Sequence, residues 1–226
     1  MKVAVIIPAY NEAPSIAKVV NAIPLEMNAT VIVVNNGSTD NTVEEATNAG
    51  AIVLNESRKG YGWACLKGIE HACQEGAEIV VFMDGDFSDY PSEMSLLIEP
   101  IVEGKMDFVL GSRVLGEREH GSLTPQQVFG NWLATRLIRI FYGVKFSDLG
   151  PFRAIRTDAL KPLKMSDKTY GWTIEMQIKA AKNKLRFCEI PVSYRKRIGV
   201  SKVSGTLKGT VLAGIKIIWA VFKYRF

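Results

Sequence analysis

Cysteine and histidine are scarce in this chain of 226 residues. The three cysteines (Cys65, Cys73 and Cys188) are too few for a disulfide framework, and no C-x-x-C pair indicates a zinc site. We therefore expect a reducing compartment, in which the three thiols are small core residues. The only two histidines are His71, which we interpret as structural, and His120.

Long apolar runs and the common nucleotide-binding motifs are also missing. The most apolar stretch, residues 211–222, is interrupted by Lys216 and falls short of the roughly 20 apolar residues that span a bilayer. The apolar run at residues 3–7 is too short for a signal peptide, and no small-residue cleavage site follows it. The absence of G-x-x-x-x-G-K-[ST], and of G-x-G-x-x-G after the first predicted strand, argues against P-loop and dinucleotide-binding proteins.

Acidic residues are absent from residues 190–226, where eight basic residues stand. The rest of the chain holds 20 Lys and Arg against 23 Asp and Glu, so the net charge of +5 comes from this tail. A basic tail on a mildly acidic body indicates a membrane, a nucleic acid or a phosphate as partner. The remaining composition, 47% hydrophobic and 23% charged, excludes intrinsic disorder.

Strand and helix patterns alternate through the first half of the chain. Short apolar runs at 3–7, 30–34, 51–54, 78–83 and 107–110 predict buried strands, and the segments between them predict helices. This alternation predicts an α/β fold with a parallel sheet. Later patterns predict helices at 124–142, 172–182 and 206–223 and a mobile loop at 116–122. No linker is visible, so we expect one domain, with a nucleotide-binding half (1–111), an acceptor half (112–205) and an amphipathic C-terminal helix (206–226).

Polar side chains follow four of the predicted strands, at the sheet edge where ligands bind in open parallel sheets. Asp84 and Asp86 form the sharpest pair, because side chains at i and i+2 of an extended segment point the same way. Two such carboxylates suit Mg²⁺ or Mn²⁺, with substrate phosphates completing the coordination shell. Gly85 lets a ligand approach the backbone. Taken alone, the pair is a weak signal, and an acidic turn that caps the helix at Pro91 is the better interpretation.

Taken in order, these motifs resemble the family 2 glycosyltransferases, which have the GT-A fold. The matching segments are VIIPAYNE (5–12), VVNNGSTDNT (33–42), DGD (84–86) and GSR (111–113). The resemblance implies an α/β fold with a mostly parallel central sheet flanked by helices. It implies that Pro8, Ala9, Tyr10 and Glu12 bind the nucleotide, and that Asp84 and Asp86 hold the metal.

The second half of the chain is most similar to the polyprenyl-phosphate sugar transferases of that family. The similar segments are SDLGPFRAIR (147–156), EIPV (189–192) and RIGVSK (197–202). This implies inverting transfer of a hexose from a nucleotide-sugar to a polyprenyl or dolichyl phosphate. Arg197 and Lys202 are candidates to hold the diphosphate, and Arg113 to meet the acceptor phosphate. A hydroxyl acceptor would instead require a carboxylate base, for which Asp148 is the candidate; its alternative role is to brace the Gly-Pro turn.

Two positions depart from the family pattern. Asn35 and Asn36 stand where two acidic residues are usual, and the side chain of Asn36 both accepts and donates hydrogen bonds. That pairing suits uracil, so the sequence favours a UDP-sugar over GDP-mannose, unless Asn36 only shapes the turn. After the metal motif, Ser88 and Asp89 replace a usual Gln-His pair. Asp89 is either a third acidic group at the metal or a carboxylate at a helix start.

The C-terminal segment predicts an amphipathic helix. One face is apolar and the other carries Lys208, Lys216 and Lys223, an arrangement typical of helices that lie on lipid. We therefore expect a peripheral protein at the cytoplasmic membrane face, although packing of this helix on the body is the alternative.

Competing functions are transfer to a soluble or polysaccharide acceptor and non-catalytic binding of nucleotide or nucleic acid. The intact Asp-Gly-Asp and the absence of aromatic residues between the basic ones argue against nucleic acid. The apolar face of the predicted C-terminal helix consists of Leu207, Val211, Ile215, Ile218, Trp219 and Phe222.

Overall fold

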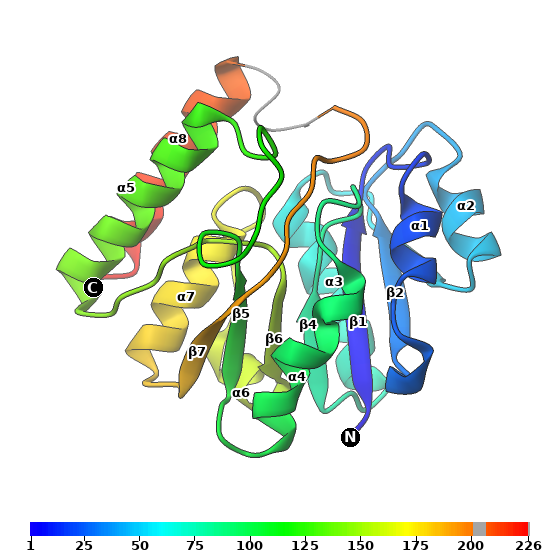
Figure 1. Ribbon diagram of the computed structural model, residues 1–226, viewed down its shortest axis with the longest axis horizontal. Helices are drawn as coiled ribbons and strands as arrows, with labels where there is room; N and C mark the ends of the chain where they lie inside the picture. Colours follow the sequence, from blue (N-terminus) through cyan, green and yellow to red (C-terminus); the bar gives the residue numbers. More distant parts are fainter. Residues whose placement is uncertain (201–206, 226) are drawn as a thin grey trace.

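A single seven-stranded sheet forms the centre of the computed structural model, which describes residues 1–200 and 207–225, with side chains for 1–200 and 214–225 (Figure 1). The strand order is β3-β2-β1-β4-β6-β5-β7. The strands are β1 (Val3–Ala9), β2 (Thr30–Asn35), β3 (Ile52–Asn55), β4 (Ile79–Phe82), β5 (Phe108–Ser112), β6 (Arg153–Arg156) and β7 (Phe187–Pro191).

The first half of the sheet is parallel, as the alternating pattern predicts. β1 pairs in parallel with β2 and β4, β2 pairs with β3, and β5 pairs with β7. β6 is antiparallel to both of its neighbours, β4 and β5. The sequence gives no sign that this late strand lies between two earlier ones, because the four-residue segment Arg-Ala-Ile-Arg carries no mark of strand direction or neighbour.

Helices cover both faces of the sheet, which gives a three-layer arrangement (Figure 1). One core contains side chains of α1 (Ile16–Asn21), α2 (Thr42–Asn48) and α4 (Met94–Val102). The other contains side chains of α3 (Tyr61–Gln74), α5 (Pro125–Tyr142), α7 (Trp172–Lys182) and α8 (Leu207–Lys223). Successive residues of β1 point to opposite cores, so the strand is buried on both sides. A short helix, α6 (Thr157–Leu160), and three 3₁₀ turns complete the described part of the chain.

Local sequence explains how the two helices beside the site are placed. A Cβ at Gly68 in α3 would lie 2.5 Å from Ile6 Cγ2, so glycine here allows α3 to pack closely on β1. α5 begins at a capping box, in which the Thr124 hydroxyl accepts from Gln127 N–H and the Gln127 side chain accepts from Thr124 N–H. Pro125 follows at the first helical position.

The C-terminal helix α8 lies beside α5 and is anchored to the body by several contacts (Figure 1). The rings of Phe141 and Phe222 meet edge to face at 5.1 Å, and Tyr224 OH donates to the Glu175 carboxylate at 2.8 Å. Lys216, expected on a free basic face, instead forms a 3.1 Å ion pair with buried Asp167. Among the helices of residues 1–200 and 207–225, none is both long and apolar enough to cross a membrane.

Candidate active site

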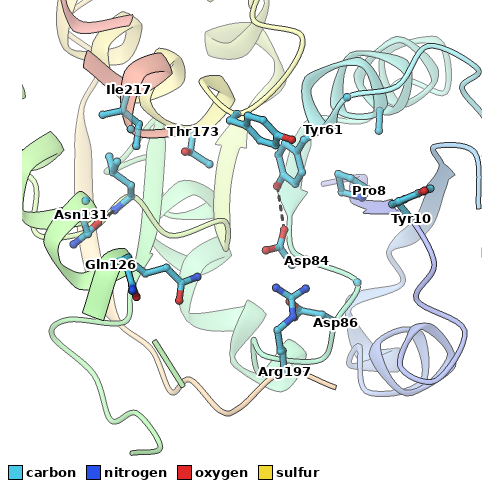
Figure 2. Close-up of a pocket in the computed structure, with 18 of the residues that line it drawn as sticks. Pro8, Tyr10, Tyr61, Asp84, Asp86, Gln126, Asn131, Thr173, Arg197 and Ile217 are labelled. Carbon is cyan, nitrogen blue, oxygen red and sulfur yellow. Dashed lines mark hydrogen bonds and ion pairs between the residues drawn. The ribbon is translucent and has the colours of Figure 1, made fainter. Parts of the chain in front are cut away.

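A cavity of about 970 Å³ lies at the carboxyl ends of the parallel strands (Figure 2). It brings together residues from motifs that are far apart in the sequence. Asp148 is not among its lining residues, and Lys202 lies outside the residues that the structure describes. The other predicted site residues all line the cavity: Pro8, Ala9, Tyr10, Glu12, Asn36, Asp84, Gly85, Asp86, Arg113 and Arg197.

Asp84 and Asp86 follow β4 directly and form the acidic part of the cavity. Asp86 is 2% exposed and accepts hydrogen bonds from the Ser88 backbone N–H and hydroxyl. Asp84 accepts a 3.2 Å hydrogen bond from the hydroxyl of Tyr61, at the start of α3 (Figure 2). Burial and the nearby charge of Asp86 raise the pKa of Asp84 to about 7.

These carboxylates fit a divalent cation. The charge of Asp86 raises the pKa of Asp84, so a positive charge nearby would favour ionised Asp84, and hard cations prefer oxygen ligands. Among the residues described, no third Cys, His, Asp or Glu joins them in a cluster able to hold a metal. The protein would therefore supply two carboxylates, which suits an ion that also binds substrate phosphates.

Asp89, for which two roles were open, lies behind Asp84 and Asp86. Its side chain is 2% exposed and accepts a 3.3 Å hydrogen bond from Asp84 N–H. Asp89 is not among the cavity-lining residues. Burial and the charges of Asp84 and Asp86 raise its pKa well above the usual range. A buried carboxyl that accepts a hydrogen bond from the motif's backbone fits this placement better than a third metal ligand.

Arg197 projects into the cavity beside Asp86, as Figure 2 shows. Its Nη2 lies 2.7 Å from Asp86 Oδ2 and 3.8 Å from Glu12 Oε1. Its backbone segment is attached to the metal-binding loop, since Ile198 N–H donates to Asp86 O at 2.9 Å. Arg195 reinforces this attachment by donating to the carbonyls of Phe87 and Asp89.

Asn36 contacts the protein backbone in place of a base. Its amide nitrogen donates to the carbonyls of Glu56 and Arg58 at 3.0 and 2.8 Å, and its Oδ1 accepts from Gly60 N–H at 2.7 Å. Both amide hydrogens are thereby used. The sequence argument for uracil from Asn36 therefore loses its support, and the alternative role, shaping the loop, is the one observed.

Arg113 and Asp148 form a bidentate ion pair at the edge of the cavity. Arg113 Nε and Nη2 donate to the two Asp148 oxygens at 2.7 Å each, and Arg113 N–H donates to Oδ2 at 2.9 Å. Burial alone would raise the pKa of Asp148, but the charge and hydrogen bonds of Arg113 hold it below the usual value. Asp148 is 1% exposed, so its carboxylate faces Arg113 and not the cavity.

A second part of the cavity is largely apolar, although Gln126, Gln127 and Asn131 of α5 also line it, and this part was not predicted from the sequence. Its wall comes from the N-terminal half of α5, from Leu149 and from Ile217 of α8 (Figure 2). Tyr61, Tyr170 and Thr173 also line the cavity. Helical periodicity locates α5 and α8 but does not say that they pack together. The apolar residues contributed by α5 are Phe129 and Leu133.

The loop at 116–122, expected to be mobile, is partly attached to the segment that carries Arg197. Tyr194 N–H donates to Glu117 O and Glu119 N–H donates to Tyr194 O, both at 2.8 Å. A Cβ at Gly116 would lie 2.1 Å from Val192 O, which explains the glycine. Closure of this loop over the site stays a prediction.

The fold and the acidic cavity at the strand ends define a GT-A glycosyltransferase. A family model described as "Glycosyl transferase family 2" matches residues 4–163, and the chain belongs to that family. A structure of glucosyl-3-phosphoglycerate synthase from Mycobacterium tuberculosis, in complex with Mn²⁺, UDP and phosphoglyceric acid, superposes with a TM-score of 0.79 at 21% identity. The match covers 99% of this chain and 78% of that one, and it shows the shared fold.

Curated relatives carry more specific names. Glycosyltransferase AglJ of Haloferax volcanii is 32% identical over 86% of this chain, which spans 63% of that protein. A UDP-N-acetylglucosamine–dolichyl-phosphate N-acetylglucosaminyltransferase of Methanococcus voltae is 30% identical, over 83% of each chain. An undecaprenyl-phosphate mannosyltransferase of Micrococcus luteus is 27% identical, over 95% of this chain and 93% of its own.

Proposed function

We propose that this protein is an inverting, metal-dependent glycosyltransferase that moves a hexose from a nucleotide-sugar to a polyprenyl phosphate. The observation that carries the proposal is the two-part cavity. Its acidic end suits a metal-bound diphosphate, and its apolar end between α5 and α8 suits the first isoprene units of a lipid. The names of the M. voltae and M. luteus relatives agree with this acceptor class.

The donor is proposed to be a UDP-sugar. The support comes from the donor named for the M. voltae relative and from the UDP complex of the structural neighbour, since Asn36 gives none. GDP-mannose is the alternative donor, and a thermal-shift panel of UDP- and GDP-sugars with Mn²⁺ distinguishes them, because bound ligand raises apparent stability.

In this proposal Asp84 and Asp86 hold Mg²⁺ or Mn²⁺ at the acidic end. The bound cation neutralises charge on the departing diphosphate. Arg197 contributes a further positive charge at the same end. Arg113, held by Asp148, orients the acceptor phosphate at the junction with the apolar end. A lipid phosphate is ionised at neutral pH and needs no strong general base, so Asp148 acts by positioning Arg113.

We further propose that α8 and α5 rest on the membrane surface. The row of α8 predicted to face lipid is exposed where described: Ile215, Ile218, Trp219 and Phe222 are 41–59% exposed. α5 adds Phe129 and Trp132, whose rings lie 5.9 Å apart and are 60% and 58% exposed. Residues 124–146 contain no acidic residue, so this surface is also suited to anionic headgroups.

The direct test is transfer of radiolabelled sugar from UDP-sugars to polyprenyl phosphate in the presence of Mn²⁺, followed by extraction with organic solvent. The proposal expects the label in the organic phase, and no transfer by Asp86→Ala. Label that stays in a water-soluble product would indicate a soluble or polysaccharide acceptor. Absence of transfer or hydrolysis with every nucleotide-sugar would contradict the enzyme assignment.

A further inference from the structure

The guanidinium of Arg197 lies where a cation is needed. It forms a 2.7 Å ion pair with Asp86 and reaches within 3.8 Å of Glu12, and Figure 2 shows it beside both aspartates of the metal-binding motif. Asp86 is 2% exposed, so its charge requires compensation by a nearby positive group. Arg197 supplies that charge in the absence of a metal.

Arg197 is not held as a structural arginine is. Arg153, which is buried, donates to the carbonyls of Leu149, Gly150 and Thr173, so its guanidinium is surrounded by fixed acceptors. In contrast, Nε of Arg197 is buried with no hydrogen-bond partner among the described residues, and the side chain is 30% exposed. The side chain can therefore exchange its carboxylate partner for another anion by rotation.

The backbone beneath Arg197 does not need to move in this exchange. Ile198 N–H donates to Asp86 O and Arg195 N–H donates to Ser88 O, at 2.9 and 3.0 Å. These bonds attach the strand-like segment to the metal-binding loop. The guanidinium thus stays within a side-chain length of Asp86 whichever anion it contacts.

We infer that Arg197 is a built-in counter-ion that competes with the divalent metal for Asp86 and is released to the diphosphate when the nucleotide binds. This inference rests on the proposed function of the site. Two positive charges cannot both contact Asp86 without repulsion, so Arg197 weakens metal binding to the free protein. A diphosphate offers the guanidinium a new partner and removes the competition. Metal and nucleotide therefore bind with positive coupling, and each raises the affinity for the other by the same factor.

The test measures Mn²⁺ binding by titration calorimetry, or from the electron paramagnetic resonance signal of free Mn²⁺, with and without saturating UDP. The variant is Arg197→Met, and the matched control is Lys196→Met, which removes one positive charge from the exposed neighbouring position. Without UDP, Mn²⁺ is expected to bind Arg197→Met about tenfold more tightly than the unchanged protein, because the guanidinium that competes for Asp86 is lost. Lys196→Met is expected to bind as the unchanged protein does.

UDP provides the second measurement. In the unchanged protein, UDP is expected to raise Mn²⁺ affinity by a factor about tenfold larger than in Arg197→Met, because only the direct metal–diphosphate attraction remains in the variant. Arg197→Lys keeps the charge but replaces the guanidinium by a more strongly hydrated ammonium on a flexible stem, so its Mn²⁺ affinity is expected to be intermediate. This variant also serves if Arg197→Met does not fold.

Unchanged or weaker Mn²⁺ binding to the free Arg197 variants would overturn the inference. If the unchanged protein also transfers sugar with Mn²⁺, the proposed function stands and only the competition is wrong. Tighter Mn²⁺ binding to Arg197→Met, together with no transfer by the unchanged protein from any nucleotide-sugar, would support the competition for Asp86 and remove the proposed function. If no variant binds Mn²⁺, with or without UDP, both fail.

Discussion

Asp148 accepts three hydrogen bonds from Arg113, two from the guanidinium and one from the backbone N–H, all between 2.7 and 2.9 Å. Ser147, the preceding residue, is itself fixed by the Glu189 carboxylate, which accepts from its backbone and hydroxyl. The pair therefore links the end of β5 to the turn before β6 and to β7. Such a support fixes one orientation of Arg113 toward the cavity.

Replacing Asp148 by Asn tests this support against a role as general base. We expect kcat/KM for the lipid phosphate to fall about 10- to 100-fold, because Arg113 loses its bidentate partner. The pH at which activity falls on the acid side is expected to stay the same in the variant. The double variant Arg113→Met with Asp148→Asn is expected to be no worse than Arg113→Met alone. Loss of the acid limb of the pH profile in Asp148→Asn would instead indicate a base.

The contrast between Asp86 and Asp89 predicts different responses to removal. Asp86→Ala is expected to abolish the rise in melting temperature that Mn²⁺ and UDP produce, because a metal ligand in the cavity is lost. Asp89→Asn is expected to keep that rise. Burial and the charges of Asp84 and Asp86 raise the pKa of Asp89, which favours its neutral form, and an amide has the same shape as a neutral carboxyl. Loss of the Mn²⁺ response in Asp89→Asn would place Asp89 among the metal ligands.

The raised pKa of Asp84 predicts that this carboxyl destabilises the metal-free protein at alkaline pH. Its pKa is about 7 in the fold and about 3.9 in an unfolded chain, so between these values the folded state binds more protons. Stability from this group therefore falls as pH rises from about 4 to 7. In EDTA, Asp84→Asn is expected to be more stable at pH 8 by ~1–2 kcal/mol after discounting for solvent screening, with no difference at pH 4.

Metal supplies the control for that measurement. Mn²⁺ at pH 8 is expected to stabilise the unchanged protein but not Asp84→Asn, so the order of their melting temperatures reverses. Each kcal/mol corresponds to about 2–4 °C for a chain of this size, which calorimetry resolves. An equal advantage of Asp84→Asn at pH 4 and pH 8 would show that the gain does not come from ionisation of Asp84.

Asn36 is predicted to act on nucleotide affinity without reading the base. Asn36→Asp places a carboxylate against the carbonyls of Glu56 and Arg58, which costs roughly 1–3 kcal/mol of loop stability. Binding of UDP and of GDP, measured by calorimetry, is expected to weaken by the same factor. A change in the ratio of the two affinities would show that Asn36 contacts the base after all.

The sequence predicts the site better where neighbouring strands are parallel than where the chain reverses. Strand ends in a parallel region meet at one edge by geometry, which is why Asp84 and Asn36 were expected together and line one cavity. The position of β6 between β4 and β5, and the packing of α5 against α8, depend on contacts between distant segments. No periodicity encodes these contacts, so the apolar end of the cavity and the inward Lys216 were missed.

The sequence also does not predict which groups the side chains of the site contact. A nucleotide base and the protein backbone can both form hydrogen bonds with the amide group of Asn36. Only the path of residues 56–60 decides that the backbone forms them. Similarly, the acidic residue nearest the metal motif in sequence, Asp89, lies behind it. The left-handed backbone of Phe87, with φ of 63°, turns the chain between Asp86 and Asp89.

The exposed face of α5 predicts membrane binding that does not depend on α8 alone. Trp132 and Ile140 are 58% and 64% exposed and do not line the cavity, so their replacement leaves the cavity lining unchanged. The double change Trp132→Ala with Ile140→Ala is expected to reduce sedimentation with anionic liposomes by at least tenfold, since each side chain gives about 1.5–3 kcal/mol when fully buried in lipid. Leu25→Ala, in the 3₁₀ turn Leu25–Met27 and outside α5 and α8, removes an apolar side chain that is 94% exposed, and this variant is expected to sediment normally. Neutral liposomes are expected to retain less protein, because the basic residues then lose their partners. Equal sedimentation of the double variant and the unchanged protein would exclude α5 from the membrane-binding surface.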